Sequence, residues 1–335
     1  NQEAVLLYTQ YKDNSWSEPV RITSGSDWFV NWADFPANAI NGNLLLTSYL
    51  KKSASETYTY DILLNLETLS GNKIKDNFLL NTDGIKAEHG FVSMIPNNSS
   101  GFYVTWLDGR NTVTNTKETH HKAMTIRFAE ITNTGEIINE TELDATTCDC
   151  CQTSIALSSE GPIVVYRNRS EDEIRDIYIT KYRNGIWEQP VPVFNDGWEI
   201  NGCPVNGPKV VVNQTTTAVA WFTAADDNPK VNLSFSLSDK DEFNLPIQLN
   251  DLDAIRGGDI LMYRFNTFLS MIGKDEVENN NEAETVESPP NSESTIGIGE
   301  LMGKRAKLEE AIDYVGLMIK NLKDKRTMLE KDIEE

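Results

Sequence analysis

The stretch CDCCQT (residues 148–153) opens the segment that decides the fold. An apolar run follows at 162–166, an alternating run at 176–182, and the tetrapeptide WEQP at 187–190 closes the segment. Short runs in which apolar and polar side chains alternate, separated by Gly, Asn or Asp, are typical of antiparallel β-strands with one buried face. The segment therefore predicts one small antiparallel sheet.

The same arrangement recurs along residues 1 to about 262. The other openings are NWADFP (31–36), AEHGF (87–91) and NGCPV (201–205). Apolar strands are expected at 44–50, 102–107, 162–166 and 217–222, and alternating strands at 58–66, 124–131, 176–182 and 231–236. A short outer strand is expected near WSEP (16–19), WEQP (187–190) and FNLP (243–246). A four-stranded unit repeated in a ring is the blade of a β-propeller, in which neighbouring blades bury each other's apolar faces.

The repeats add up to less than a closed ring. The chain opens with a third strand at 4–11 and a fourth at 18–23, four complete units follow, and IRGGDI (255–260) resembles a sixth opening. The predicted fold class is therefore all-β, a six-bladed β-propeller that is incomplete in this chain. A gap in the ring would leave unpaired strand edges and exposed apolar faces.

The composition changes after residue 262, which predicts three regions. Residues 1–262 hold all seven Trp and all four Cys and form the propeller. Residues 263–298 are acidic and rich in Asn, Glu, Ser and Pro, so we expect a disordered linker. Residues 299–335 repeat apolar side chains every seven positions, which predicts a coiled-coil helix and an oligomer, with a single docked amphipathic helix as the alternative. The core positions include Leu301, Leu308, Val315, Leu322 and Leu329.

The charge balance excludes several classes of partner. The chain carries 51 acidic and 30 basic side chains, a net charge of −21. Binding of nucleic acid or an anionic membrane surface needs clustered Lys and Arg, and a membrane span needs about twenty apolar residues in a row, which no stretch approaches. The chain begins NQE (1–3) without Met or an apolar leader, which leaves a removed export signal open. We expect a secreted or periplasmic protein.

Several longer runs resemble the sialidase superfamily of propellers with BNR-type (Asp-box) repeats, within it the bacterial sialidase-like or exo-alpha-sialidase group. The resemblance covers about residues 4–262. It rests on DWFVNWADFP (27–36), EHGFVS (88–93), WLDGR (106–110), CDCCQT (148–153), YRNRSEDEIRD (166–176) and GWEINGCPVNGP (197–208). One Asp-box copy, SLSDKDEF (236–243), keeps the Ser and an aromatic but loses the Asp register and the Gly, and no Arg-Ile-Pro segment is present.

The resemblance implies a glycoside hydrolase acting on terminal sialic acid or a related acidic sugar. A non-catalytic propeller that binds glycans or proteins and is oligomerised by its tail is the alternative. Whether the chain is an enzyme depends on the site, because one fold carries many functions.

A sialidase needs Arg forks for the substrate carboxylate, an acid for the leaving oxygen and a carboxylate-assisted Tyr. Candidate groups lie where inner strands begin or where the first two strands of a blade join, the end that faces the central funnel. The candidate catalytic residues are Asp34, Glu88, Asp108, Arg110, Arg167 and Arg169, with His89 and Glu199 in similar segments. No motif assigns the Tyr–Glu pair.

Each candidate has a structural alternative. Asp108 and Arg110 could form a salt bridge within one turn, and Asp34 before Phe-Pro could be a turn-forming acid. Arg167 and Arg169 belong to a dense mixed-charge loop that could be a solvated network of ion pairs.

The cysteines gather at two neighbouring openings. Cys148, Cys150 and Cys151 open one unit and Cys203 opens the next, and equivalent places in adjacent blades lie close together. In an exported protein Cys203 could form a disulfide with Cys150 or Cys151. Thiolates of Cys150, Cys151 and Cys203 could instead bind a soft metal with His89 and the His120-His121 pair, and free buried thiols are a third possibility. No other cofactor is expected.

Overall fold

The structure is a computed structural model of the chain, and it describes residues 3–113, 123–213, 216–237 and 242–249. The chain divides into two units, Asn1–Val277 and Glu278–Glu335, and all of the described residues belong to the first. The predicted linker (263–298), the coiled coil (299–335), the sixth opening (255–260) and the His120-His121 pair lie outside the described residues.

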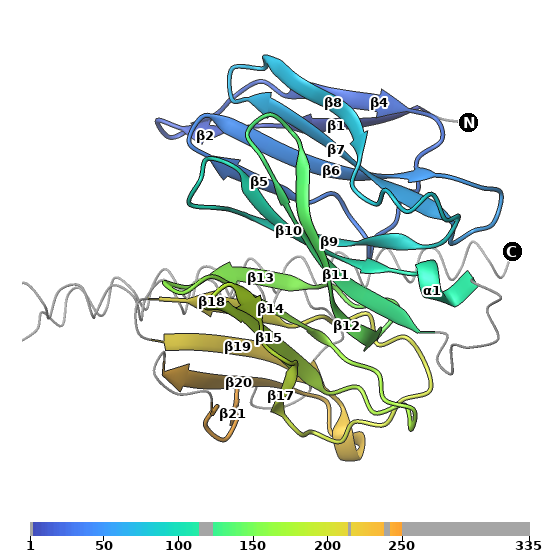
Figure 1. Cartoon of the computed structure of the whole chain (residues 1–335), viewed down its shortest axis with the longest axis vertical. Coiled ribbons are helices and arrows are strands. Elements are labelled where there is room, and N and C mark those ends of the chain that lie inside the picture. The colour runs from blue at the N-terminus through green and yellow to red at the C-terminus, as the bar shows by residue number, and fades with distance from the viewer. Residues whose placement is uncertain (1–2, 114–122, 214–215, 238–241, 250–335) are drawn as a thin grey trace, which may run out of the picture. The chain divides into compact units, whose positions relative to one another are not determined.

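The described residues form six antiparallel sheets, of which five follow one another along the chain and the sixth is a two-stranded hairpin within the first (Figure 1). Sheet 1 pairs β1 (Ala4–Tyr8) with β4 (Val20–Gly25), and the hairpin of β2 (Tyr11–Lys12) and β3 (Ser15–Trp16) lies between them in sequence. Sheet 2 contains β5 (Asn38–Asn41), β6 (Leu44–Lys52), β7 (Tyr60–Thr68) and β8 (Lys73–Leu79). Sheet 3 contains β9 (His89–Pro96), β10 (Phe102–Asp108), β11 (Met124–Ile131) and β12 (Ile137–Thr147), and the short helix α1 (Arg110–Val113) follows β10.

The last two sheets repeat this pattern. Sheet 4 contains β13 (Ser154–Leu157), β14 (Pro162–Arg167), β15 (Ile177–Arg183), β16 (Ile186–Trp187) and β17 (Val191–Phe194), the last two both paired with β15. Sheet 5 contains β18 (Lys209–Val212), β19 (Thr216–Thr223), β20 (Lys230–Leu237) and β21 (Ile247–Gln248), with a 3-10 turn at Ala225–Asp227.

The four complete units expected from the sequence are confirmed as sheets 2 to 5, each built from consecutive strands in chain order. The predicted opening on a third and a fourth strand corresponds to the β1–β4 pair. The all-β class is therefore confirmed for the part of the chain that the structure describes, and the number of blades in a closed ring stays a prediction.

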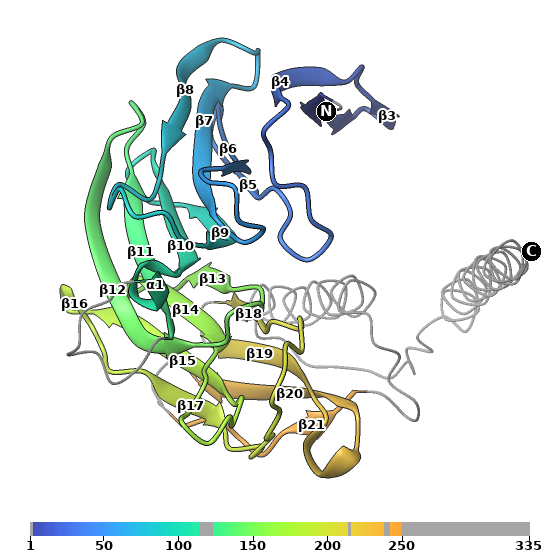
Figure 2. The same cartoon turned by 90° about the vertical axis from the view of Figure 1, so that its right-hand side faces the viewer.

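Figure 2 shows the sheets from β5–β8 through β18–β21 following one another in chain order. Apolar side chains pack between these neighbouring sheets. One core cluster joins sheets 2 and 3, for example through Leu64 and Trp106, both 0% exposed. A second joins sheets 3 and 4 through Phe128 and Tyr166, and a third joins sheets 4 and 5 through Ile179 and Trp221. Sheets 3 and 4 thus each bury one face on the preceding sheet and the other on the following sheet, as propeller blades do.

The two outermost described sheets lack such a neighbour on one side. In sheet 5 the cluster of Ala218, Ala220 and Leu233 is joined only by Val211 and Phe235 from the same sheet. In sheet 1, Val5 and Leu7 are 45% and 50% exposed. The gap in the ring stays a prediction. No described helix is long and apolar enough to cross a bilayer.

Candidate active site

The openings of several sheets meet at one end of the strands. The side chain of Gln152 connects three of them: its Nε2 donates to the Ala33 carbonyl at 2.8 Å, and its Oε1 accepts from the Gly207 amide at 3.1 Å. A Cβ at Gly207 would overlap the Gln152 carbonyl, so only glycine permits this approach. The openings at 31–36, 148–153 and 201–208 are therefore connected by hydrogen bonds between one side chain and two backbone groups.

Asp34 and Glu88, predicted from matching places in consecutive units, share one phenol. The Tyr60 Oη donates to Glu88 Oε1 at 2.7 Å and lies 3.3 Å from Asp34 Oδ2. The Phe91 amide donates to Asp34 Oδ1 at 2.8 Å. Tyr60 and Asp34 are 1% and 4% exposed, whereas Glu88 is half-buried and is the member of the cluster that faces solvent.

Gly90 makes this arrangement possible. An ideal Cβ at residue 90 would collide with the Asp34 carboxylate and press on the Tyr60 ring. The motif EHGF (88–91) thus places Glu88 immediately before β9. Gly90 follows two positions later, and the Asp34 carboxylate lies against its backbone. The carboxylate position is set by the backbone and not by a flexible loop.

Burial raises the pKa of both carboxyl groups. Desolvation raises the pKa of Asp34 to about 7, and the charge of Glu88 adds to it while the Phe91 amide and Tyr60 oppose it. Desolvation also raises the pKa of Glu88 to about 7, opposed by the Tyr60 hydrogen bond and supported by the charge of Asp149. Among the described residues no salt bridge joins Lys, Arg or His to either group, so no cation opposes the rise of the two pKa values towards neutral pH.

Asp108 and Arg110 form the turn salt bridge that was the alternative reading of LDGR. Arg110 donates from Nε to Asp108 Oδ1 at 2.8 Å and from Nη2 to Asp108 Oδ2 at 2.7 Å. The same Nη2 lies 3.2 Å from Asp83 Oδ2 and 3.1 Å from Glu140 Oε1. Burial raises the pKa of Asp108, but Arg110 and His89 outweigh it and hold that pKa below its usual range. The guanidinium is therefore occupied by carboxylates of its own chain.

Asp83, His89 and Asp108 could hold a metal ion, because their ligand atoms lie within 4.8 Å of one another. His89 is fully buried, its Nδ1 lies 3.2 Å from the Tyr60 carbonyl, and its Nε2 lies 3.2 Å from Asp83 Oδ2. Arg110 also supplies positive charge to both aspartates.

Arg167 has a packing role. It is 1% exposed, and its guanidinium donates to three backbone carbonyls, those of Asn206, Arg175 and Phe222, while it lies 5.0 Å from the centre of the Trp198 ring. The prediction that the Arg167 guanidinium binds a substrate carboxylate therefore differs from the structure, in which its N–H groups donate to backbone carbonyls. A sequence pattern does not reveal these acceptors.

Arg169 belongs to the predicted network of ion pairs. Its Nη1 contacts Asp149 Oδ2 at 2.7 Å and its Nη2 contacts Glu173 Oε1 at 2.7 Å. Glu199 is exposed. Neither residue reaches the Asp34–Tyr60–Glu88 cluster through a recorded contact, although Asp149 influences Glu88 electrostatically.

Cys150 and Cys203 form a disulfide, one of the two pairings that the sequence left open, while Cys148 and Cys151 are free and buried. The predicted metal set of His89, Cys150, Cys151 and Cys203 is not assembled, because two of its sulfurs bond to each other and His89 faces carboxylates. Cys148 Sγ lies 3.1 Å from Cys151 Sγ. The hydrogen bond from Cys151 lowers the pKa of Cys148 to about 6, and Arg167 and Arg175 contribute.

No protein-family model and no curated protein matches the chain. Solved structures show a partial likeness. An α-L-arabinofuranosidase from Lactobacillus brevis has 12% identity and a TM-score of 0.39, covering 63% of this chain and 72% of that one. A GH43 endo-arabinanase from Bacillus licheniformis has 10% identity and a TM-score of 0.33, covering 65% and 80%. AofleA from Arthrobotrys oligospora has 9% identity and a TM-score of 0.28, covering 72% and 81%. None of these three is described as a sialidase, and likenesses this distant indicate no activity.

Proposed function

We propose that this chain is a glycoside hydrolase whose reaction centre is the cluster of Asp34, Tyr60 and Glu88. The observation that supports the proposal is a pair of carboxyl groups that contact one phenol oxygen and have no cationic partner in the described part of the chain. Hydrolysis of a glycosidic bond needs one carboxyl group as proton donor and a second as base or nucleophile. A pair of groups with pKa values of about 7 can exchange these roles near neutral pH.

Glu88 is the proposed catalytic acid and base, because it is the more exposed of the two carboxyl groups. In the first half of the reaction Glu88 protonates the leaving oxygen while the Asp34 carboxylate bonds to the anomeric carbon. In the second half Glu88 takes a proton from water, whose oxygen displaces Asp34 from that carbon. Tyr60 orients Glu88 through its 2.7 Å hydrogen bond and connects it to Asp34. A carboxylate next to a tyrosine hydroxyl is also the arrangement that a carboxylate-assisted Tyr nucleophile requires.

The separation of the carboxyl groups favours retention of the anomeric configuration. Two carboxylates that contact one phenol oxygen lie within about 6 Å of each other, which is closer to the spacing of retaining than of inverting glycosidases.

Two observations bear on the sugar. The sequence resemblance supports terminal sialic acid or a related acidic sugar. The contacts of the arginines favour an uncharged sugar. Each arginine in the described ranges already contacts an acceptor of its own chain and is therefore not available as a partner for a substrate carboxylate. These arginines are Arg21, Arg110, Arg127, Arg167, Arg169, Arg175 and Arg183.

A panel of fluorogenic glycosides tests the proposal, with a sialoside as the acidic member and arabinofuranoside, galactoside and glucoside as neutral members. We expect turnover of at least one member, and proton NMR of the first product should show the substrate's own anomer. Turnover confined to the sialoside would support the resemblance. An intact, folded chain that hydrolyses no member at any pH between 5 and 8 would contradict the proposal.

A further inference from the structure

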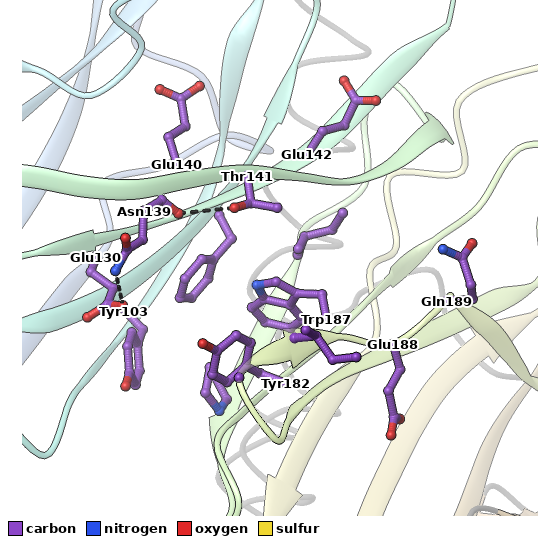
Figure 3. A pocket seen from close by; sticks show the side chains of 15 residues that line it. Tyr103, Glu130, Asn139, Glu140, Thr141, Glu142, Tyr182, Trp187, Glu188 and Gln189 are labelled. Atoms are coloured by element: carbon purple, nitrogen blue, oxygen red, sulfur yellow. Dashed lines mark hydrogen bonds between the residues drawn. The ribbon is translucent and has the colours of Figure 1, made fainter.

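A pocket lies away from the proposed reaction centre, between the edge strand β12 and the hairpin of β15 and β16 (Figure 3). Its volume is about 630 Å³. Four aromatic side chains form its wall: Tyr103, Phe128, Tyr182 and Trp187. None of its lining residues belongs to the Asp34–Tyr60–Glu88 cluster or contacts it through a recorded hydrogen bond. We call this pocket the β12 groove.

The aromatic wall is held by ring contacts and still presents polar atoms. The Trp187 ring lies 4.8 Å from the Phe128 ring and 5.5 Å from the Tyr182 ring, with edge-to-face geometry. Phe128 is buried, whereas Tyr103, Tyr182 and Trp187 are half-buried. Among the described residues, no hydrogen bond is recorded for the two tyrosine hydroxyls or for the Trp187 indole N–H. Aromatic side chains with an unpaired polar atom are suited to a ligand that is apolar on one face and polar at its edge.

Strand alternation decides which side chains of β12 face the groove. Asn139 and Thr141 lie on the side of the aromatic rings, and Glu140 and Glu142 point away from them (Figure 3). The two glutamates contact Arg127 on that opposite side, at 3.0 Å each. The pocket interior is therefore aromatic, amide and hydroxyl in character.

An irregularity in the sheet shapes this face. The β11–β12 register shifts between Phe128 and Glu130, and Asn139 has a φ of 56°. Asn139 Nδ2 donates to Glu130 Oε1 at 2.8 Å, which fixes this carboxylate beside Tyr103. Bulges on edge strands often redirect side chains towards a binding surface.

Charge decides the class of ligand. The lining contains Glu130, Glu140, Glu142 and Glu188 and no Lys or Arg, which opposes an anionic ligand. Glu140 and Glu142 are balanced by Arg127, Glu188 lies 3.4 Å from Arg183, and Glu130 accepts from an amide, so the carboxylates are hydrogen-bond acceptors rather than free charges. Sugar hydroxyls donate to such acceptors, and the C–H face of a pyranose or furanose ring packs on aromatic rings.

We infer that the β12 groove is a binding site for neutral oligosaccharides, separate from the reaction centre. Trp187 and Tyr182 form the stacking surface. Glu130 accepts hydrogen bonds from the sugar hydroxyls, and Asn139 and Thr141 accept or donate them. The groove would bind one part of a glycan while another part, or a second glycan, is cleaved at the reaction centre.

Calorimetric titration of the full chain with neutral cello-, xylo- and arabino-oligosaccharides tests the inference, with an oligogalacturonate as the anionic comparison. We expect binding of at least one neutral series and none of the anionic one. Trp187→Ala should weaken that binding at least tenfold, and Trp187→Phe, which keeps the contacts with Phe128 and Tyr182, should weaken it less. Trp16→Ala is the matched control, because Trp16 is 69% exposed and lies on β3.

Hydrolysis of the small fluorogenic glycosides should be unchanged in Trp187→Phe, which separates this site from the reaction centre. If Trp187→Ala does not fold, as judged by circular dichroism, Thr141→Lys at the mouth of the groove replaces it and should abolish binding. The inference would be overturned if the chain bound no neutral series or bound the oligogalacturonate more strongly. It would also be overturned if Trp187→Ala and Thr141→Lys bound the oligosaccharide as well as the wild type.

Discussion

Two clusters of acidic side chains lie at neighbouring sheet openings and differ in one respect. Asp34 and Glu88 face a phenol and have no cationic partner among the described residues, and burial raises their pKa values. Asp108 is fully buried, but the guanidinium of Arg110 binds it in a bidentate manner and its pKa is lowered. Carboxyl groups in similar places thus have raised pKa values in one cluster and a lowered pKa in the other.

The comparison shows why position alone does not assign a catalytic role. Both clusters contain residues that the repeat pattern nominates, and both lie where strands begin or end. Removing a cation from a buried carboxylate leaves an uncompensated charge, whereas a carboxyl group that is already protonated carries none. The two clusters should therefore respond differently to mutation and to pH.

The largest expected effect on stability is in the paired cluster. Arg110→Ala leaves Asp108, Asp83 and Glu140 without their common cation and should lower the free energy of unfolding by about 3 kcal/mol. Urea denaturation followed by tryptophan fluorescence measures it. Arg21→Ala, which removes an exposed ion pair with Glu3, should change the free energy by less than about 1 kcal/mol and serves as the control. Equal effects of the two substitutions would remove the distinction between the clusters.

A smaller effect is expected from Gly90→Ala. The added Cβ displaces the Asp34 carboxylate, which should cost about 1–3 kcal/mol and also reduce turnover, because Asp34 and Glu88 no longer share Tyr60. Gly202→Ala is the control, since its nearest atom lies 3.9 Å from the new Cβ. Urea denaturation and initial rates should be measured on both proteins. A Gly90→Ala protein with unchanged stability and turnover would show that the cluster tolerates displacement.

The pH dependence of stability should have opposite signs in the two clusters. The folded pKa values of Asp34 and Glu88, about 7, lie above the unfolded values near about 4. The folded chain then binds more protons, so their contribution to stability decreases as the pH rises from about 4 to about 7. The lowered pKa of Asp108 gives a contribution that is lost as the pH falls below about 4.

Urea midpoints between pH 3 and 8 measure these slopes. Asp34→Asn and Glu88→Gln should each flatten the decline between pH 4 and 7, and Asp108→Asn should leave it in place. A decline that persists unchanged in the double variant Asp34→Asn/Glu88→Gln would assign it to other groups and would contradict the raised pKa values.

Much of the fold could be predicted from the sequence because β-strands carry a period of two that is visible locally. The predicted strand at 231–236 and the observed β20, Lys230–Leu237, nearly coincide. The alternating strand at 58–66 begins two residues before β7, Tyr60–Thr68. Short outer strands were predicted near WSEP (16–19), WEQP (187–190) and FNLP (243–246), and β4, β17 and β21 directly follow these motifs. The division of the fourth strand of sheet 4 into β16 and β17 depends on pairing across the sheet and was not predicted.

The site was predicted in part. Asp34 and Glu88 stand at equivalent places in two repeats, which the sequence shows, but their common partner Tyr60 depends on how β7 and the opening at 87–91 lie side by side. Arg167 was predicted to bind a carboxylate because guanidinium forks do so. Its acceptors, the carbonyls of Asn206 and Phe222, are distant in sequence and leave no pattern. Trp187 was interpreted only as a marker of the repeat, although it also lines the β12 groove.

The most direct test of the proposed reaction centre compares two glutamates by the same substitution. Glu88→Gln removes an unpaired carboxyl group, whereas Glu140→Gln removes one that Arg110 and Arg127 already neutralise. We predict that kcat/KM for the best glycoside of the panel falls by about 10²–10⁴ in Glu88→Gln, while folded Glu140→Gln retains most of its activity. Wild-type activity in folded Glu88→Gln, or an equal loss in both proteins, would contradict the assignment of the site.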